Sequence, residues 1–257
     1  MDRFTFGLRA YLATPRLRGL LAMSMAVAAA GAMVIVNTVV LVQGELGMSE
    51  RWTAVLLMCF GAGSMVAALS MSQVLARLED RPVSLSAGAI MASALGLGAL
   101  NPGYVALALL WFVIGLGYSA VLVIAGRLLQ RSSTKPDRPA YFAAQFALSH
   151  LCFLVTYALA GWLGSTYGLP LTFAMFSAIV LLALGAAAAL WPAQDDRELL
   201  HEHPAVDHAH LHIHDEHHQH AHEGWEGPEP HSHPHRHVPI KHRHRFTIDL
   251  HHNAWPR

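Results

Sequence analysis

The chain has 257 residues, of which 54% are hydrophobic and only 13% are charged, against about 25% charged residues in an ordinary soluble protein. The formal net charge at pH 7 is zero, so the charge balance gives no reason to expect nucleic acid as a partner. The two cysteines, Cys59 and Cys152, lie in apolar runs and are typical of packing residues rather than of a disulfide framework or a redox motif.

Residues 1–18 carry four arginines among phenylalanine, leucine and tyrosine side chains. This segment is too short and too basic for the apolar region of a secretory signal. We predict that residues 1–18 form a basic cytosolic segment at the membrane interface, leading into a membrane helix.

Six apolar stretches follow, each close to the ~20 residues needed to cross a bilayer. The turn signals Asn101-Pro102-Gly103 and Gly168-Leu169-Pro170 separate runs that would otherwise merge. The pattern predicts an all-α integral membrane protein, in which residues 19–192 form six transmembrane helices embedded in a lipid bilayer. Small residues within the stretches, such as Gly63 and Gly115, are expected to let these helices pack closely. The predicted spans are 19–42, 53–76, 83–101, 104–126, 140–163 and 170–191.

The distribution of lysine and arginine predicts the orientation in the membrane. Ten of these residues fall in residues 1–18 and in the second and fourth connectors, whereas Arg51 stands alone in the odd-numbered connectors. Both termini are therefore expected in the cytosol.

Few polar side chains fall inside the predicted spans, and none is Asp, Glu, Lys or Arg. Gln145 and Ser149 share one helical face of the fifth span, and His150 lies one step around from Ser149. An ionisable residue inside a membrane is a functional candidate by default. We therefore take His150, Gln145, Ser149 and Asn37 as candidates for a transport cavity. The alternative is that these groups hydrogen-bond between helices.

Eighteen of the nineteen histidines lie in the last 57 residues. Neutral imidazole is a common ligand of zinc, copper, nickel and cobalt, and short histidine-rich tracts are typical of metal binding. Residues 193–257 are predicted to be a cytosolic metal-binding tail, largely disordered; the alternative is a solvated tail without a specific ligand. The candidate metal ligands are His201, His203, His208, His210, His212, His214, His217, His218, His220, His222, His231, His233, His235 and His237.

Several segments carry a resemblance to a known family. Leu75–Val83 resembles a degenerate form of the Asp-Arg-x-Gly-Arg-Arg loop of major facilitator superfamily transporters, without its glycine. Tyr11–Arg18 resembles the loop before the seventh helix of that family, and Trp111–Tyr118 with Gly126–Ser133 resembles its tenth helix and the loop beyond. Together with Asp137–His150 and the histidine-rich tail, the order of these segments is similar to NreB-type nickel-resistance permeases.

The resemblance implies the C-terminal six-helix half of such a transporter, in a bacterial cytoplasmic (inner) membrane. It implies a secondary antiporter that exports a divalent transition metal, nickel first, with cobalt, zinc and copper left open. We expect a truncated or split half, or a half that pairs with a second six-helix half in another chain or a second copy. No obligatory cofactor is expected.

Two other functions stay open. One is a membrane-anchored metal buffer or sensor without transport of its own, and the other is a transporter of a small organic solute. An enzyme is not expected, because the sequence holds no nucleophile–base pair, phosphate loop or zinc-protease motif.

Overall fold

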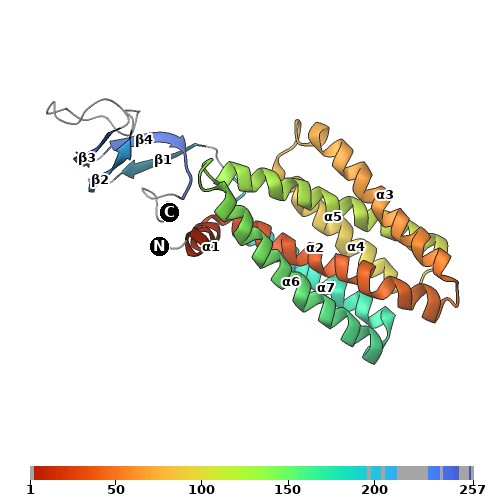
Figure 1. Ribbon diagram of the computed structural model, residues 1–257. Coiled ribbons are helices and arrows are strands. Elements are labelled where there is room, and N and C mark those ends of the chain that lie inside the picture. Colours follow the sequence, from red (N-terminus) through yellow and green to blue (C-terminus); the bar gives the residue numbers. More distant parts are fainter. Residues whose placement is uncertain are drawn as a thin grey trace. The chain divides into compact units, whose positions relative to one another are not determined.

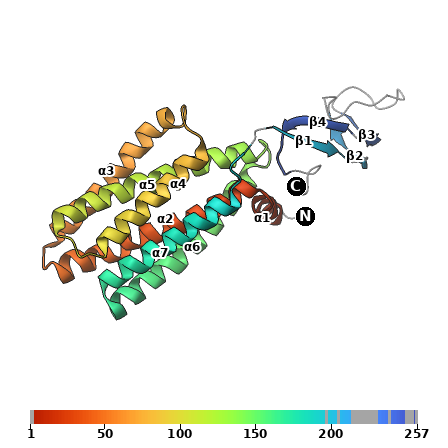
Figure 2. The ribbon, with the colours of Figure 1, turned by 180° about the vertical axis from the view of Figure 1, so that it is seen from behind.

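The computed structural model describes residues 3–195, 198–203, 206–212, 231–237, 240–248 and 255. Residues 3–190 are built from helices joined by short turns, as Figures 1 and 2 show from opposite sides. The helices are α1 (Arg3–Ala13), α2 (Pro15–Val39), the π-helix η1 (Val40–Glu45) that continues α2, α3 (Glu50–Val74), α4 (Asp80–Gly98), α5 (Tyr104–Ser132), α6 (Arg138–Tyr167) and α7 (Leu169–Leu190).

Helix α2 is the centre of the bundle. It begins with Pro15, whose fixed φ suits the first helical position, and its run Ala26–Ala32 consists almost only of small residues. Side chains of this size allow neighbours to approach from several directions, and α2 contacts α4, α5, α6 and α7. Helix α3 packs mainly against α5.

Glycines set the close contact between α3 and α5, as the sequence predicts. A Cβ on Gly63 would lie 1.9 Å from the carbonyl oxygen of Phe112, and a Cβ on Gly115 would lie 2.1 Å from that of Phe60. Only a residue without a side chain fits at either position. The Ser64 hydroxyl adds a hydrogen bond of 3.2 Å to the carbonyl oxygen of Gly115.

The turn signals read from the sequence are confirmed. Helix α4 ends at Gly98 and α5 begins at Tyr104, with Asn101 at a φ of 54° between them. Helices α6 and α7 are separated by Gly168, whose φ of 81° lies in the left-handed region that glycine adopts without strain.

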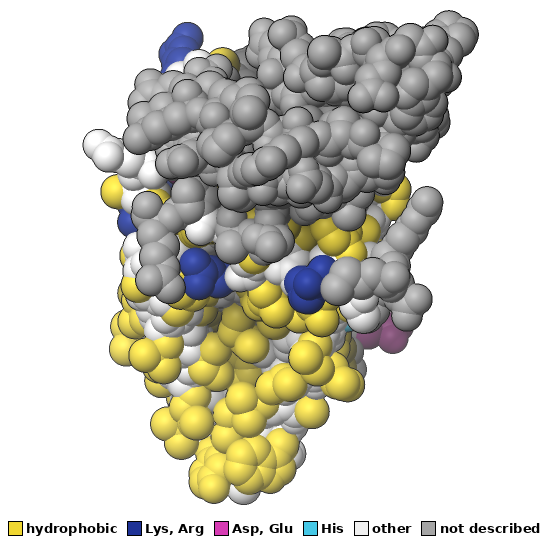
Figure 3. Space-filling model, turned by 90° about the vertical axis from the view of Figure 1, so that its left-hand side faces the viewer, with side chains coloured by type: hydrophobic (Ala, Val, Ile, Leu, Met, Phe, Trp, Pro, Cys, Tyr) yellow, Lys and Arg dark blue, Asp and Glu magenta, His cyan; other side chains and the backbone are white. Residues whose placement is uncertain are grey.

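The helices include spans suited to a lipid bilayer. Among the described residues, five segments are long and apolar enough to cross a membrane, and they cover five of the six predicted spans: 15–45, 50–74, 104–132, 138–167 and 169–190. The predicted span 83–101 falls on α4, which has only 19 residues and is rich in serine and glycine. On the face shown in Figure 3, hydrophobic side chains cover most of the bundle and Lys and Arg side chains lie toward one end. The protein is therefore an integral membrane protein, and the sixth span stays a prediction.

The chain divides into two compact units, Met1–Asp195 with Thr247–Trp255, and Asp196–Phe246 with the last two residues. In the second unit, β1 (Glu198–His203) pairs antiparallel with β4 (Ile240–Arg245), and β2 (Val206–His212) pairs antiparallel with β3 (His231–His237). Residues 193–257 are predicted to be largely disordered, whereas the structure describes these strands within them. Their alternating pattern, with histidine at every second position of β2 and β3, fits the two-residue period of a strand.

Candidate functional site

The transport-cavity candidates on α6 differ in what they contact. His150 is exposed, its Nδ1 lies 2.8 Å from the carbonyl oxygen of Phe146 one turn earlier, and its ring centroid lies 3.8 Å from that of Phe146. When Nδ1 donates to that carbonyl, Nε2 is left with its lone pair as a metal ligand or proton acceptor. Ser149 donates a hydrogen bond of 3.1 Å to the same carbonyl oxygen.

Gln145 joins three helices. Its side-chain oxygen accepts a hydrogen bond from the Tyr11 hydroxyl of α1, and its amide nitrogen donates to the Ser24 hydroxyl of α2 at 3.0 Å. Tyr11 is fully buried, and this burial raises the pKa of its phenol well above the usual 10. These contacts favour a role in holding α1 against the bundle.

Asn37 is only 3% exposed. Its amide nitrogen lies 3.4 Å from the carbonyl oxygen of Ala160 on α6 and 3.3 Å from the sulfur of Met33. The next residue, Thr38, accepts a hydrogen bond of 2.9 Å from the indole nitrogen of Trp111 on α5. Asn37 and Thr38 thus tie α2 to its neighbours, so the structure does not bring the four candidates into one cluster.

Aromatic rings extend the surface on which His150 lies. His150 is followed along α6 by Phe153, at 6.0 Å between centroids, and then by Tyr157, 5.6 Å further on. On α5, Tyr118 contacts Phe60 of α3 at 5.3 Å. Gly31 links the two sets, since a Cβ placed there would lie 3.1 Å from Tyr118 and 3.6 Å from Phe153. We call these six residues the aromatic row: Phe60, Tyr118, Phe146, His150, Phe153 and Tyr157.

A network of charged side chains lies at the end of the bundle where α4 and α6 begin and α7 ends, here called the terminal end. The buried carboxylate of Asp80 lies 3.0 Å from Nε of Arg127 and 3.7 Å from a nitrogen of Arg131. Arg131 also lies 3.2 Å from the carboxylate of Asp195, which pairs with Arg16 at 2.7 Å. The network joins α2, α4 and α5 to the chain beyond α7.

Arg16 is the most enclosed cation of this network, with a side chain only 3% exposed. Its Nε donates a hydrogen bond of 2.8 Å to the hydroxyl of Ser132 at the end of α5. Nearby, Arg81 of α4 donates hydrogen bonds of 2.9 Å to the carbonyl oxygens of Ala188 and Trp191. The ends of α2, α4, α5 and α7 are therefore held together by cations on carboxylates and carbonyls.

The chain returns to the terminal end after the histidine-rich segment. The Tyr141 hydroxyl donates a hydrogen bond of 3.2 Å to the carbonyl oxygen of Ile248, which is 4% exposed. The guanidinium of Arg16 lies over the ring of Trp255. We call these two contacts, Tyr141 with Ile248 and Arg16 with Trp255, the C-terminal anchor. Sequence reasoning missed both it and the charge network, because each joins residues that lie far apart in the sequence, as Asp80 and Arg127 or Arg16 and Trp255 do.

The predicted metal ligands lie outside the helical bundle. Nine are in strands, namely His201, His203, His208, His210, His212, His231, His233, His235 and His237. His214, His217, His218, His220 and His222 lie outside the described residues. Among the described residues, no group of three or more His, Cys, Asp or Glu side chains is placed to hold a metal ion.

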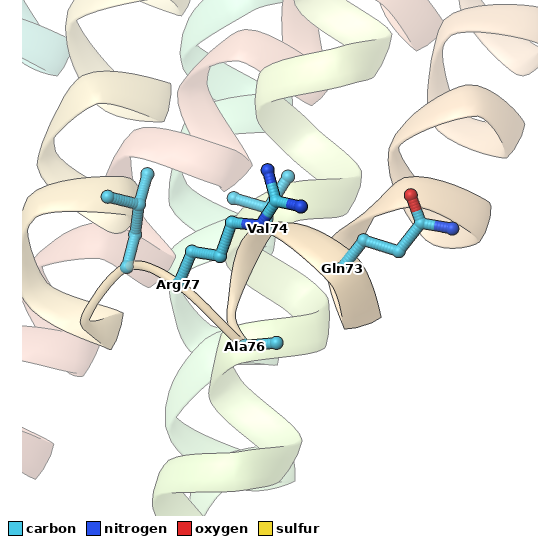
Figure 4. A pocket seen from close by; sticks show the side chains of 5 residues that line it. Gln73, Val74, Ala76 and Arg77 are labelled. Atoms are coloured by element: carbon cyan, nitrogen blue, oxygen red, sulfur yellow. The ribbon is translucent and has the colours of Figure 1, made fainter.

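A hollow of about 590 Å³ opens at the turn between α3 and α4. Figure 4 shows Gln73 and Val74 at the end of α3 and Ala76 and Arg77 in the turn that follows. All five lining residues come from the stretch 73–78. The hollow is therefore a local depression of one turn, and not a cavity between helices.

Three comparisons with known proteins bear on the family. Residues 21–243 match the family model described as Major Facilitator Superfamily. This range includes nearly all of the helical bundle, with the aromatic row and most of the charge network. No curated protein and no solved structure matches the chain.

Proposed function

The chain belongs to the major facilitator superfamily, whose members are membrane transporters and not enzymes, and from this premise we propose that it exports a divalent transition metal. Nickel is the first metal to test, because the sequence resembles nickel-resistance permeases; cobalt, zinc and copper also bind imidazole nitrogen, with affinities in the order Co < Ni < Cu > Zn. The observation that carries the proposal is the concentration of 18 of 19 histidines in the last 57 residues.

In this proposal the histidine-rich segment collects metal in the cytosol, where both termini lie. The segment is covalently attached to the bundle, so it raises the local metal concentration at the terminal end. The ions then cross along the surface that carries His150, in exchange for protons. A second six-helix half, in another chain or a second copy, completes the pathway, because carriers of this kind hold their substrate between two halves.

His150 is the residue proposed to handle metal within the membrane. It is exposed on α6, and its Nδ1 is held by the carbonyl of Phe146. The helical bundle contributes no carboxylate near it, since the described aspartates and glutamates lie at the ends of the helices. An imidazole that alternately binds metal and a proton suits an antiport cycle.

The test is uptake of radioactive or fluorescently detected Ni²⁺ into inside-out vesicles with a proton gradient. The full chain is compared with a variant that lacks residues 198–245 and so keeps the C-terminal anchor. We expect the deletion to reduce uptake at low Ni²⁺ and to leave it nearly intact at high Ni²⁺. If the full chain protects cells from nickel while its vesicles show no gradient-dependent uptake, the protein is a metal buffer or sensor instead.

A second candidate function, transport of a small organic solute, is favoured by the aromatic row. Four helices of the bundle (α2, α3, α5 and α6) meet at rings and phenols rather than at metal ligands, and aromatic faces attract organic cations and apolar bodies. Competition separates the two functions. If tetraphenylphosphonium uptake exceeds that of vesicles without the protein, and Ni²⁺ is neither taken up nor inhibitory, the organic solute is the substrate and metal export is rejected.

A further inference from the structure

The hollow at the turn between α3 and α4 has a mixed lining. Arg77 contributes a cation and Gln73 an amide, and both side chains are exposed. In the view of Figure 4 these two long side chains extend in the same direction from the chain. Val74, Ala76 and Leu78 contribute the apolar part of the lining. The volume of about 590 Å³ lies within the range of about 300–1,000 Å³ that pockets for small ligands occupy, so the hollow can hold one small polar group.

Arg77 differs from three other arginines at the terminal end. Arg127 and Arg131 pair with the carboxylate of Asp80, and Arg81 donates hydrogen bonds to backbone carbonyls. Among the residues that the structure describes, the guanidinium of Arg77 has neither a carboxylate partner nor a hydrogen bond. Its five N–H donors are therefore open to a ligand from outside the protein.

The hollow lies at the end of an exposed stripe of α3. Met65, Leu69 and Gln73 follow one another at intervals of four residues, which places them along one side of the helix. Met65 is 60% exposed and Leu69 is 74% exposed. Arg77 follows Gln73 after four more residues, in the turn beyond α3. The stripe thus changes from apolar to amide to cation toward the terminal end.

The polar end of this stripe lies where α3 leaves the membrane. Helix α3 is one of the segments long and apolar enough to cross a bilayer, and its 25 residues extend about 37 Å at 1.5 Å per residue. This length exceeds the ~30 Å hydrocarbon core and falls within the ~40–45 Å that includes the headgroups. Gln73 and Arg77 therefore lie at the level of the lipid headgroups, whereas Met65 and Leu69 lie at the level of the acyl chains.

We propose that the hollow binds the phosphate of one anionic phospholipid, whose acyl chain lies along Met65 and Leu69. A guanidinium matches two oxygens of a phosphate with parallel hydrogen bonds, and the amide of Gln73 supplies a further donor. None of the described lining residues is acidic, so the ammonium group of a zwitterionic lipid would find no partner among them. The lipid that fits is therefore of the phosphatidylglycerol type, with a phosphate and no cation. This site is independent of the substrate that the protein transports.

The experiment titrates the purified full chain in detergent with fluorescently labelled phosphatidylglycerol. We expect Arg77→Gln to weaken binding roughly fivefold, the effect of one arginine at an anionic lipid surface. Arg77→Lys keeps the charge without the planar pair of donors and should retain part of the affinity. Arg18→Gln is the matched control, because it removes an exposed cation of α2 at the same end of the bundle, and it should bind as the parent does.

Equal losses of lipid binding in Arg77→Gln and Arg18→Gln overturn the site, because net positive charge alone then explains the affinity. All of these positions are exposed, so we expect every variant to fold, and size-exclusion chromatography checks this. Binding is measured without flux, so the result stands whether or not the protein exports Ni²⁺.

A second pair of variants tests the acyl chain. Leu69→Ser makes the middle of the stripe polar and should weaken binding of the labelled lipid. Leu154→Ser changes a leucine of α6 that is 69% exposed, close to the exposure of Leu69, and should leave binding at the parental level. Equal binding by both variants contradicts the position proposed for the chain.

Competing ligands separate the lipid from its parts. Inorganic phosphate and glycerophosphoglycerol carry the anion without acyl chains, and neither should displace the labelled lipid. Displacement by inorganic phosphate would make the hollow a site for free anions and reject the lipid. Unlabelled phosphatidylcholine with the same chains should compete less well than phosphatidylglycerol, and equal competition would reject the preference for an anionic headgroup.

Discussion

The guanidinium carbon of Arg16 lies 4.9 Å from the centroid of the Trp255 ring. The same guanidinium pairs with Asp195 at 2.7 Å. Arg16 therefore contacts the residue at which the chain leaves the bundle and a residue near the end of the chain, on either side of the histidine-rich segment.

Removing the Trp255 ring should loosen the C-terminal anchor. We expect Trp255→Ala to lower the free energy of unfolding by about 0.5–2 kcal/mol, because a partly enclosed cation–π contact and its packing are lost. Trp255→Phe keeps a ring over Arg16 and should recover part of the difference. Thermal unfolding in detergent measures both, and equal Tm values for Trp255→Ala and the parent would contradict the anchor.

Asp80 is the acidic residue that Arg127 and Arg131 share. We expect Asp80→Asn to destabilise the protein by roughly 1–3 kcal/mol, less than a fully buried pair would lose, because Arg127 is 46% exposed and water screens it. Glu79→Gln is the matched control, since it removes an adjacent and exposed carboxylate. Chemical denaturation gives the free energy of unfolding of the two variants. Equal losses of stability in both would show that the change in net charge, and not the ion pairs of Asp80, causes the effect.

The contact between α3 and α5 predicts a sharp difference between two glycines of one helix. Gly63→Ala forces a Cβ onto the Phe112 carbonyl and should cost about 1–3 kcal/mol as the helices separate. Gly61→Ala is the control, because no atom lies within 4 Å of a Cβ placed there. Thermal stability and yield of folded protein are the measurements, and comparable losses at both positions would rule out this packing.

Tyr11 should make the protein sensitive to alkali. Burial raises its pKa in the folded state above the ordinary value of 10.0, so the folded chain keeps a proton that the unfolded chain releases. Stability is therefore unaffected below about pH 10 and falls as pH rises beyond it. Tyr11→Phe should be less stable at pH 8, because it leaves Gln145 without a donor.

The slope of stability against pH above 10 separates this effect from general alkaline unfolding. It should be flatter in Tyr11→Phe than in the parent. Equal slopes in Tyr11→Phe and the parent would contradict the buried phenol as the cause. Unfolding midpoints in guanidinium between pH 8 and 11.5 give the comparison.

His150→Ala tests the proposed handling of metal within the membrane. We expect lower Ni²⁺ uptake in inside-out vesicles and a weaker dependence of uptake on pH, because the group proposed to exchange metal for a proton is gone. Ser149→Ala changes the adjacent residue, which bonds to the same carbonyl, and should have the smaller effect. Parental uptake and pH dependence in His150→Ala would exclude His150 from the pathway.

The parts of the fold that depend on local sequence were predictable. The lengths of the apolar stretches and the turn signals predict most of the helices, and Gly63 and Gly115 predict the close packing of α3 against α5. Asp80 begins α4 and Asp195 lies beyond the end of α7, and a sequence gives no sign that Arg131 pairs with both. The strands of the second unit have a sequence signal that was overlooked because the segment was judged by its composition. Histidine occurs at every second position of residues 208–212 and 231–237, which matches the two-residue period of a strand.

The contacts of the candidate residues could not be read from the sequence. His150 is exposed on α6, while Gln145 and Asn37 use their amides to join helices, and their place in a transport cavity stays a prediction. The aromatic row escaped prediction because its rings come from α3, α5 and α6, and each ring taken singly is an ordinary apolar residue of a membrane helix.

Attachment to the bundle at both ends limits how far the histidine-rich segment can extend from it. The second unit spans Asp196–Phe246, and a loop of that length with both ends at one place extends at most roughly 85 Å from it, at about 3.4 Å per residue over half the loop. One ion confined to a half-sphere of that radius is at a concentration of about 1 mM. Under the proposed function, an ion released from the segment would therefore meet the bundle at a local concentration of about this size.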